Sequence, residues 1–109
     1  MSEMTLREIC NLTGVTRRTI QGYENTGLVS AIRKNDRGYL LYDESALETI
    51  KRMKLFQEMG FSIKEIKELE HAPDDIIKRS LNKRINELKK EYQHMDHMIE
   101  IAVEIMKQL

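Results

Sequence analysis

The sequence predicts a mainly α-helical protein with a winged helix-turn-helix head and one long C-terminal helix. Two short helical segments meet at a glycine turn, Gly14-Val15, and a basic hairpin follows them. From Pro73 onward, apolar residues recur every seven positions, which is typical of a helix that pairs with another helix. We therefore divide the chain into a head, residues 1–71, and a helix, residues 72–109.

The charge of the chain is balanced but unevenly distributed. Its 109 residues include 18 basic and 18 acidic side chains, so the formal net charge is zero. This balance argues against a protein that is held on nucleic acid by charge alone, because such proteins are usually basic overall. Between Arg17 and Arg37, however, five basic residues occur with only two acidic ones. A local positive surface is expected there.

The sequence shows no pattern typical of an enzyme, a membrane protein or an exported protein. Its single cysteine, Cys10, cannot form an internal disulfide, which suits a reducing cytoplasm. No stretch approaches the roughly 20 apolar residues of a membrane span, and no signal-peptide pattern opens the chain. Without a nucleophile–base pair, a Gly-rich phosphate loop or a metal triad, we expect a cytoplasmic protein that is not an enzyme and has no cofactor.

The head should begin with two capped helices. Thr5 and Glu8 match a capping box, which opens a first helix that ends near Gly14. Thr16 is the expected N-cap of a second helix, and Gly27 stands where a left-handed residue would end it. These helices form the helix-turn-helix candidate.

A hairpin and two further helices complete the predicted head. Residues 29–33 and 39–42 are the expected strands, and residues 34–38 form a polar loop between them. Asp43 should cap a third helix that ends at Gly60. A second capping box is formed by Ser62 and Glu65, and it opens a short fourth helix; Pro73 then belongs to the first turn of the long helix.

The long helix carries two apolar series that together form a coiled-coil seam. At about 1.5 Å per residue the helix reaches roughly 50 Å, and a seam of that length cannot be buried against so small a head. A second copy of the chain is the simplest partner, which predicts a two-fold homodimer. The expected dimerisation residues are Leu81, Ile85, Leu88, Tyr92, Met95, Ile99, Ala102 and Met106.

Two motifs also resemble a known family. The first motif lies within residues 16–42 and consists of RTI, YE, GL, DRGY and a final Tyr. The second is MGFSIKEIKEL at residues 59–69. Together they resemble the MerR family of bacterial winged-helix transcriptional regulators. The resemblance covers roughly residues 4–69. It implies a homodimer, joined by an antiparallel coiled coil, that distorts a promoter spacer and so acts on RNA polymerase indirectly. The chain would be a short member without a separate effector domain.

The second helix supplies the first candidate DNA contacts. In a helix-turn-helix the start of this helix enters the major groove, where Arg17 and Arg18 could bind guanine bidentately. A solvated arginine pair is the alternative. The resemblance implies a phosphate contact for Tyr23, whose alternative is core packing. It also implies a second wing at Ser62 and Lys64, where free helix amides could hold a phosphate.

The hairpin supplies the remaining candidates. Arg33, Lys34 and Arg37 would follow phosphates or the minor groove, and a solvated loop is the alternative. We assign Tyr39 to the DNA side and Tyr42 to packing. The expected DNA-binding residues are Thr16, Arg17, Arg18, Tyr23, Arg33, Lys34, Arg37, Tyr39, Ser62 and Lys64.

Three positions depart from the family pattern. Gln21 and Leu40 stand where the family usually has Arg, and Gly22 stands where it has Tyr or a similarly large residue. Fewer cationic contacts weaken DNA binding and flatten its salt dependence. On the long helix, His94 and His97 suggest a metal site, but no cysteine pair follows them, so we interpret them as solvated and expect no metal.

The sequence therefore predicts a homodimeric, sequence-specific DNA-binding transcriptional regulator with an inverted-repeat promoter operator. One alternative is an architectural, excisionase-like protein that bends DNA. The other is a coiled-coil interaction protein whose head has lost DNA binding, which the neutral net charge and the three departures favour.

Overall fold

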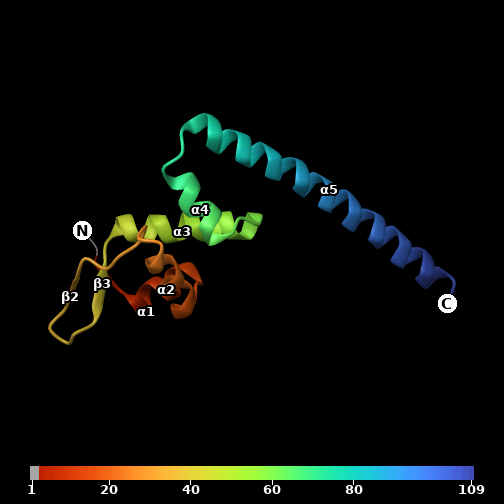
Figure 1. Cartoon of the computed structure of the whole chain (residues 1–109). Coiled ribbons are helices and arrows are strands. Elements are labelled where there is room, and N and C mark those ends of the chain that lie inside the picture. Colours follow the sequence, from red (N-terminus) through yellow and green to blue (C-terminus); the bar gives the residue numbers. More distant parts are fainter. Residues whose placement is uncertain (1–2) are drawn as a thin grey trace. The chain divides into compact units, whose positions relative to one another are not determined.

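The computed structural model describes residues 3–109. The chain separates into two compact units, a head, Met1–His71, and a helical unit, Ala72–Leu109. Figure 1 shows the head as a group of short helices with a small hairpin, and the second unit as one continuous helix.

The first helix of the head, α1, spans Leu6–Thr13 and begins at the predicted capping box. The Glu8 amide donates to Thr5 Oγ1 at 3.2 Å, and the Thr5 amide donates to Glu8 Oε1 at 3.1 Å. Gly14 ends the helix at φ 73°, a conformation that glycine adopts without steric cost. Both predicted ends of this helix are confirmed.

The second helix, α2, spans Arg17–Asn25. Thr16 caps it as predicted, because its hydroxyl accepts the Thr19 amide at 3.2 Å. Gly27 follows the helix with φ 82°, in the left-handed region expected of it. The turn between α1 and α2 is therefore three residues long, as a helix-turn-helix requires.

The hairpin is part of a three-stranded antiparallel sheet with the order β1-β3-β2. Its strands are β1, Met4–Thr5, β2, Arg33–Lys34, and β3, Leu40–Tyr42. The first arm is shorter than predicted: residues 29–32 form no strand, and the Val29 side chain, 3% exposed, belongs to the core. The pairing of β1 with β3 was not predicted, and it ties the wing to the start of α1.

Two further helices close the head. The helix α3, Glu44–Met59, begins at Asp43, whose carboxylate accepts the Ala46 amide at 2.9 Å, and it ends at Gly60. The helix α4, Ile63–Glu70, begins after Ser62 with the predicted capping box. The core of the head lies among these elements; its largest fully buried side chains are Ile9, Ile20, Tyr23, Tyr42, Ile50 and Met53.

The second unit is the single helix α5, Asp74–Lys107. Pro73 is its N-cap residue and not a member of its first turn, one position earlier than predicted. No residue of α5 is buried. Within residues 3–109, no helix combines the length and the apolar character that a membrane crossing requires.

Candidate nucleic-acid interface

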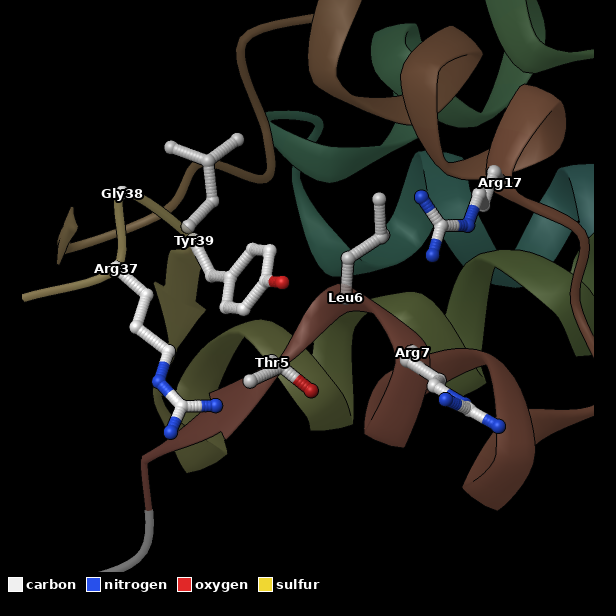
Figure 2. Close-up of a pocket in the computed structure, with 8 residues that line it drawn as sticks. Thr5, Leu6, Arg7, Arg17, Arg37, Gly38 and Tyr39 are labelled. Carbon is white, nitrogen blue, oxygen red and sulfur yellow. The ribbon is translucent and has the colours of Figure 1, made fainter. Parts of the chain in front are cut away.

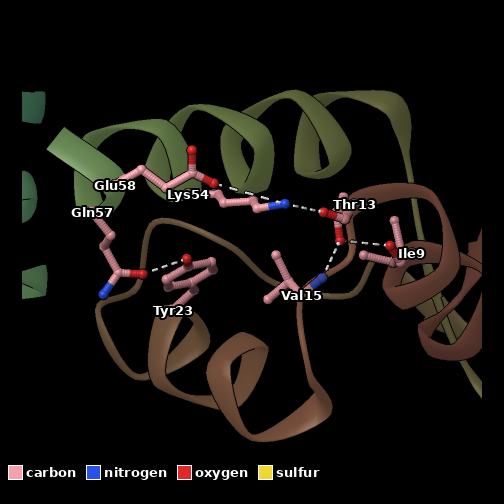
Figure 3. A network of polar contacts seen from close by, with 7 residues as sticks. All are labelled: Ile9, Thr13, Val15, Tyr23, Lys54, Gln57 and Glu58. Carbon is pink, nitrogen blue, oxygen red and sulfur yellow. Dashed lines mark hydrogen bonds and ion pairs between the residues drawn. The ribbon is translucent and has the colours of Figure 1, made fainter. Parts of the chain in front are cut away.

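The orientation of α2 is fixed by polar contacts around the helix-turn-helix turn (Figure 3). The Thr13 hydroxyl donates to the Ile9 carbonyl at 2.8 Å and accepts the Val15 amide at 3.2 Å. From α3, Lys54 Nζ donates to the Thr13 carbonyl at 2.7 Å. The ammonium group thus binds the last turn of α1, where the helix dipole favours positive charge. These contacts hold the turn against α3 and set where α2 begins.

Tyr23 belongs to this packed interior. Its side chain is 1% exposed, and its hydroxyl donates to Gln57 Oε1 on α3 at 2.5 Å (Figure 3). Burial raises the pKa of Tyr23, so the phenol remains protonated and continues to donate. The geometry supports the core-packing interpretation and leaves Tyr23 almost no surface for the predicted phosphate contact.

Tyr42 is buried as predicted, and it connects the sheet to α2. Its hydroxyl donates to the Glu24 carboxylate, and burial, followed by this hydrogen bond, raises the pKa of Tyr42. The contact fixes β3, and with it the base of the wing, to the back of the helix that carries the exposed arginines.

The tip of the wing is organised by Asn35. Its side-chain oxygen accepts the amides of Arg37 at 2.9 Å and Tyr39 at 3.0 Å. The backbone amide of Asn35 donates to the Tyr39 carbonyl at 2.9 Å, and its backbone carbonyl accepts the amide of Gly38, which has φ 81°. Such a turn, built on one Asn side chain, holds the backbone at Arg37 and Tyr39.

The two other basic residues of the wing lie in β2. Arg33 is bound by Glu3 through two hydrogen bonds, Nη2 to Oε1 at 2.5 Å and Nε to Oε2 at 3.2 Å. The hydrogen bond from Arg33 holds the pKa of Glu3 below its usual value, so the pair is charged at neutral pH. Lys34 is exposed. Arg33 is therefore already paired with an acid, whereas the prediction treated it as a phosphate ligand.

Side chains from α1, α2 and the wing surround a hollow of about 510 Å³, which we call the arginine hollow (Figure 2). Figure 2 shows Leu6 and the Tyr39 ring in its middle, with Arg37 on the wing side and Arg7 and Arg17 on the helix side. Its complete lining consists of Thr5, Leu6, Arg7, Arg17, Arg37, Gly38, Tyr39 and Leu40.

The three guanidinium groups of the arginine hollow are available to a ligand. Within residues 3–109, none of Arg7, Arg17 and Arg37 forms an ion pair, and all three are exposed. Tyr39 is also exposed, at 59%. A concave surface with three free cations and an aromatic ring can receive an anionic, partly apolar ligand.

The hollow brings together only part of the predicted set. Arg17, Arg37 and Tyr39 line it, whereas Arg18 is exposed elsewhere on α2. The hydroxyls of Thr16 and Ser62 accept amides as helix caps, and Lys64 is exposed on α4. These side chains neither join the hollow nor form a second cluster with one another in the described part of the chain.

Arg7 was missed in the sequence, where it appeared only as the interior of a capping box. Its proximity to Arg37 depends on the pairing of β1 with β3, which places the wing beside the start of α1. A basic residue in the first turn of a helix, where the dipole disfavours it, is the one signal that could have marked it.

The predicted seam of α5 is an exposed apolar stripe. Tyr92 is 71% exposed, Ile99 62% and Met106 67%. His94 and His97 are exposed on the same helix, and His97 Nδ1 lies 3.9 Å from Glu100 Oε2. Across residues 3–109, no three His, Cys, Asp or Glu side chains are grouped as a metal ion would need.

The helix pair, the exposed arginines at the start of α2 and the adjoining hairpin define a winged helix-turn-helix protein. The model of the MerR helix-turn-helix family of regulatory proteins matches residues 4–72. The chain belongs to this family, whose members are DNA-binding transcription regulators and not enzymes.

Individual relatives agree with this assignment. The chain is 34% identical, over 95 residues, to the transcriptional activator mta of Bacillus subtilis (strain 168), covering 87% of this chain and 37% of that protein. Over 60 residues it is 38% identical to the nodulation protein NolA of Bradyrhizobium sp. (strain NC92), covering 55% of this chain and 25% of that protein. The chain thus spans well under half the length of these curated relatives.

Solved structures show the same fold. The crystal structure of MtaN, the N-terminal part of the Bacillus subtilis multidrug transporter activator, is 31% identical with a TM-score of 0.69, covering 94% of this chain and 97% of that one. HiNmlR, a MerR family regulator that lacks the sensor domain and was crystallised on promoter DNA, is 17% identical with a TM-score of 0.68, covering 91% and 80%. The second likeness concerns the fold alone.

Proposed function

We propose that the protein is a homodimeric, sequence-specific transcriptional regulator that binds an inverted-repeat promoter operator in the cytoplasm. The observation that carries the proposal is the arginine hollow, in which cations from α1, α2 and the wing face a common space. The start of α2 would enter the major groove, where Arg17 and Arg18 can read base edges, and the wing would lie on the flanking backbone.

The exposed stripe of α5 supports a homodimer. Side chains as large as Tyr92 and Met106 are more than half exposed on a helix that has no buried residue. Pairing with a second copy would remove this stripe from water, and each fully buried side chain of that size contributes about 1.5–3 kcal/mol. The two-fold axis of such a dimer matches an inverted repeat.

The charges along α5 favour an antiparallel arrangement. Residues 78–90 include six Lys or Arg and one Glu, whereas residues 91–104 include four Asp or Glu and neither Lys nor Arg. Antiparallel helices place the basic half of each copy beside the acidic half of the other, and parallel helices place like charges together. Coiled-coil flanks select orientation by this kind of complementarity.

In a dimer of this kind the paired helices limit the separations that the two heads can reach. When the half-sites of a straight duplex lie outside these separations, the DNA must bend or twist to bind both heads. We propose that this distortion of the promoter spacer is the regulatory step, and that RNA polymerase responds to the altered DNA. HiNmlR, a relative in fold, was crystallised on promoter DNA, which agrees with this class of ligand.

The proposal is tested by measuring how the purified full chain binds the DNA upstream of its own gene and a scrambled duplex of equal length, across a salt series. We expect preference for the upstream DNA at an inverted repeat, with an affinity that falls as salt rises. Equal affinity for both duplexes, accompanied by bending, would instead identify the architectural protein.

A second candidate is a coiled-coil interaction protein whose head does not bind DNA. The pairing of Arg33 with Glu3 and the burial of Tyr23 favour it, because each removes an expected contact. The double variant Arg18→Ala/Arg37→Ala separates the two candidates. A regulator would lose promoter binding and reporter control in this variant, whereas an interaction protein would keep its cellular function.

A further inference from the structure

The position of the arginine hollow between two DNA-facing elements restricts what can occupy it. Its helix side is formed at the starts of α1 and α2, and its wing side by the turn that carries Arg37 (Figure 2). In a B-form duplex, one sugar-phosphate strand separates the major groove from the neighbouring minor groove. An element placed in the major groove and a wing placed beyond it must therefore have that strand between them.

The chemistry of the hollow suits such a strand. The middle is apolar and aromatic, formed by Leu6 and the Tyr39 ring (Figure 2), and it can pack against deoxyribose. The rims carry guanidinium groups, which bind phosphate oxygens through charged, directional hydrogen bonds. A base edge, by contrast, would find few polar partners in the middle of the hollow.

The polar groups of Thr5 are already used within the protein. Its amide donates to Glu8 Oε1 at 3.1 Å, and its hydroxyl contacts the same carboxylate oxygen at 3.1 Å. The side-chain donors left for a ligand in the hollow are therefore the three guanidinium groups and the Tyr39 hydroxyl, which has no partner within residues 3–109. An anion here depends on Arg7 as much as on the two arginines expected from the sequence.

We infer that Arg7, in the first turn of α1, is a DNA phosphate contact, and that the arginine hollow holds the sugar-phosphate strand between the groove read by α2 and the wing. This inference rests on the proposed function, because it takes duplex DNA as the ligand. It adds a contact from α1, and it assigns Arg7 to backbone binding, which fixes register without reading sequence.

The test compares the salt dependence of duplex binding by the full chain and its Arg7→Gln variant. Fluorescence anisotropy would be measured between about 50 and 200 mM salt on the upstream DNA and on an unrelated duplex. Each phosphate contact contributes about 0.9 to the slope of log affinity against log salt. We expect Arg7→Gln to lower this slope by about that amount on both duplexes, and Arg7→Lys to restore most of it.

The matched control is Lys107→Gln, which removes one positive charge from an exposed position of α5 outside both the seam and the basic residues 78–90. We expect this variant to bind with the slope of the unmodified chain. An unchanged slope in Arg7→Gln, or an equal decrease in Lys107→Gln, would overturn the inference, since the latter would reflect net charge alone. Circular dichroism melts check that each variant is folded.

The two proposals fail in different ways in this experiment. Preference for the upstream DNA with an unchanged slope in Arg7→Gln keeps the regulator and removes the Arg7 contact. No preference, but a reduced slope in Arg7→Gln alone, removes the specific regulator and keeps the contact. Absence of binding to either duplex at low salt would overturn both.

Discussion

The two units of the chain differ in how far their apolar side chains are buried. The head buries six large side chains almost completely, whereas α5 buries none. The head thus has a core of its own, and α5 has an apolar stripe without one. We expect the stability of the head to be independent of protein concentration and the pairing of the helix to depend on it, because association follows mass action.

The largest expected effect comes from a charge placed in the stripe. Ile99→Glu would bury an uncompensated carboxylate from each copy, which costs several kcal/mol. We expect the dimer dissociation constant, measured by analytical ultracentrifugation, to rise by at least about 100-fold. Asn86→Glu, which adds the same charge outside the stripe, is the control. Unchanged dimerisation in Ile99→Glu would show that this residue lies outside the interface.

A cavity in the core of the head should have the next largest effect. Ile50 on α3 is completely buried, so Ile50→Ala is expected to lower the free energy of unfolding by about 2–5 kcal/mol. Urea unfolding followed by circular dichroism measures this, with Lys51→Ala at the exposed neighbouring position as control. A loss that changes with protein concentration would contradict the view of the head as an independent core.

Removing the ammonium group that binds the end of α1 should lower the free energy of unfolding by less than the core cavity does. In Lys54→Met the Thr13 carbonyl loses its donor from α3, but Lys54 is partly exposed and water can replace it. We expect a loss of about 1 kcal/mol in the free energy of unfolding, and weaker DNA binding as α2 becomes less firmly held. Lys51→Met on the same helix should leave both quantities unchanged.

The smallest expected effect is a gain in the stability of the head. Gly22 lies within α2, and a Cβ added there would stand 3.6 Å from Ile63 Cδ1, an ordinary contact distance. Gly22→Ala should therefore stabilise the head by up to about 1 kcal/mol. Gly14→Ala provides the contrast, because φ is 73° there and the new Cβ would lie 3.3 Å from Lys54 Nζ. A loss of stability in Gly22→Ala would show that helix packing at this position requires a residue without a side chain.

The helix boundaries were predictable because each depends on residues close in the sequence. Thr16 and Asp43 cap helices with their own side chains, and Gly14 and Gly60 end helices through their own dihedral angles. The heptad series likewise identified α5 from spacing alone. These features require no knowledge of which distant segments meet.

The composition of the candidate site was less predictable, because it depends on distant pairings. The two-residue strand Met4–Thr5 has too little pattern to be recognised, yet its pairing with β3 brings Arg7 beside the wing. Glu3 binds Arg33 across 30 positions of sequence. Tyr23 could be assigned to either side until the position of Gln57 was known.

For the wing contact proposed above, the Asn35 turn has a consequence for the rate of DNA binding. Because Asn35 already holds the backbone at Arg37 and Tyr39, little conformational freedom is lost there when a ligand arrives. A preorganised wing can be productive at first encounter, without a slow search among loop conformations. In the proposed complex the wing is preorganised for the duplex, and association should be limited by how quickly the duplex finds the correct orientation.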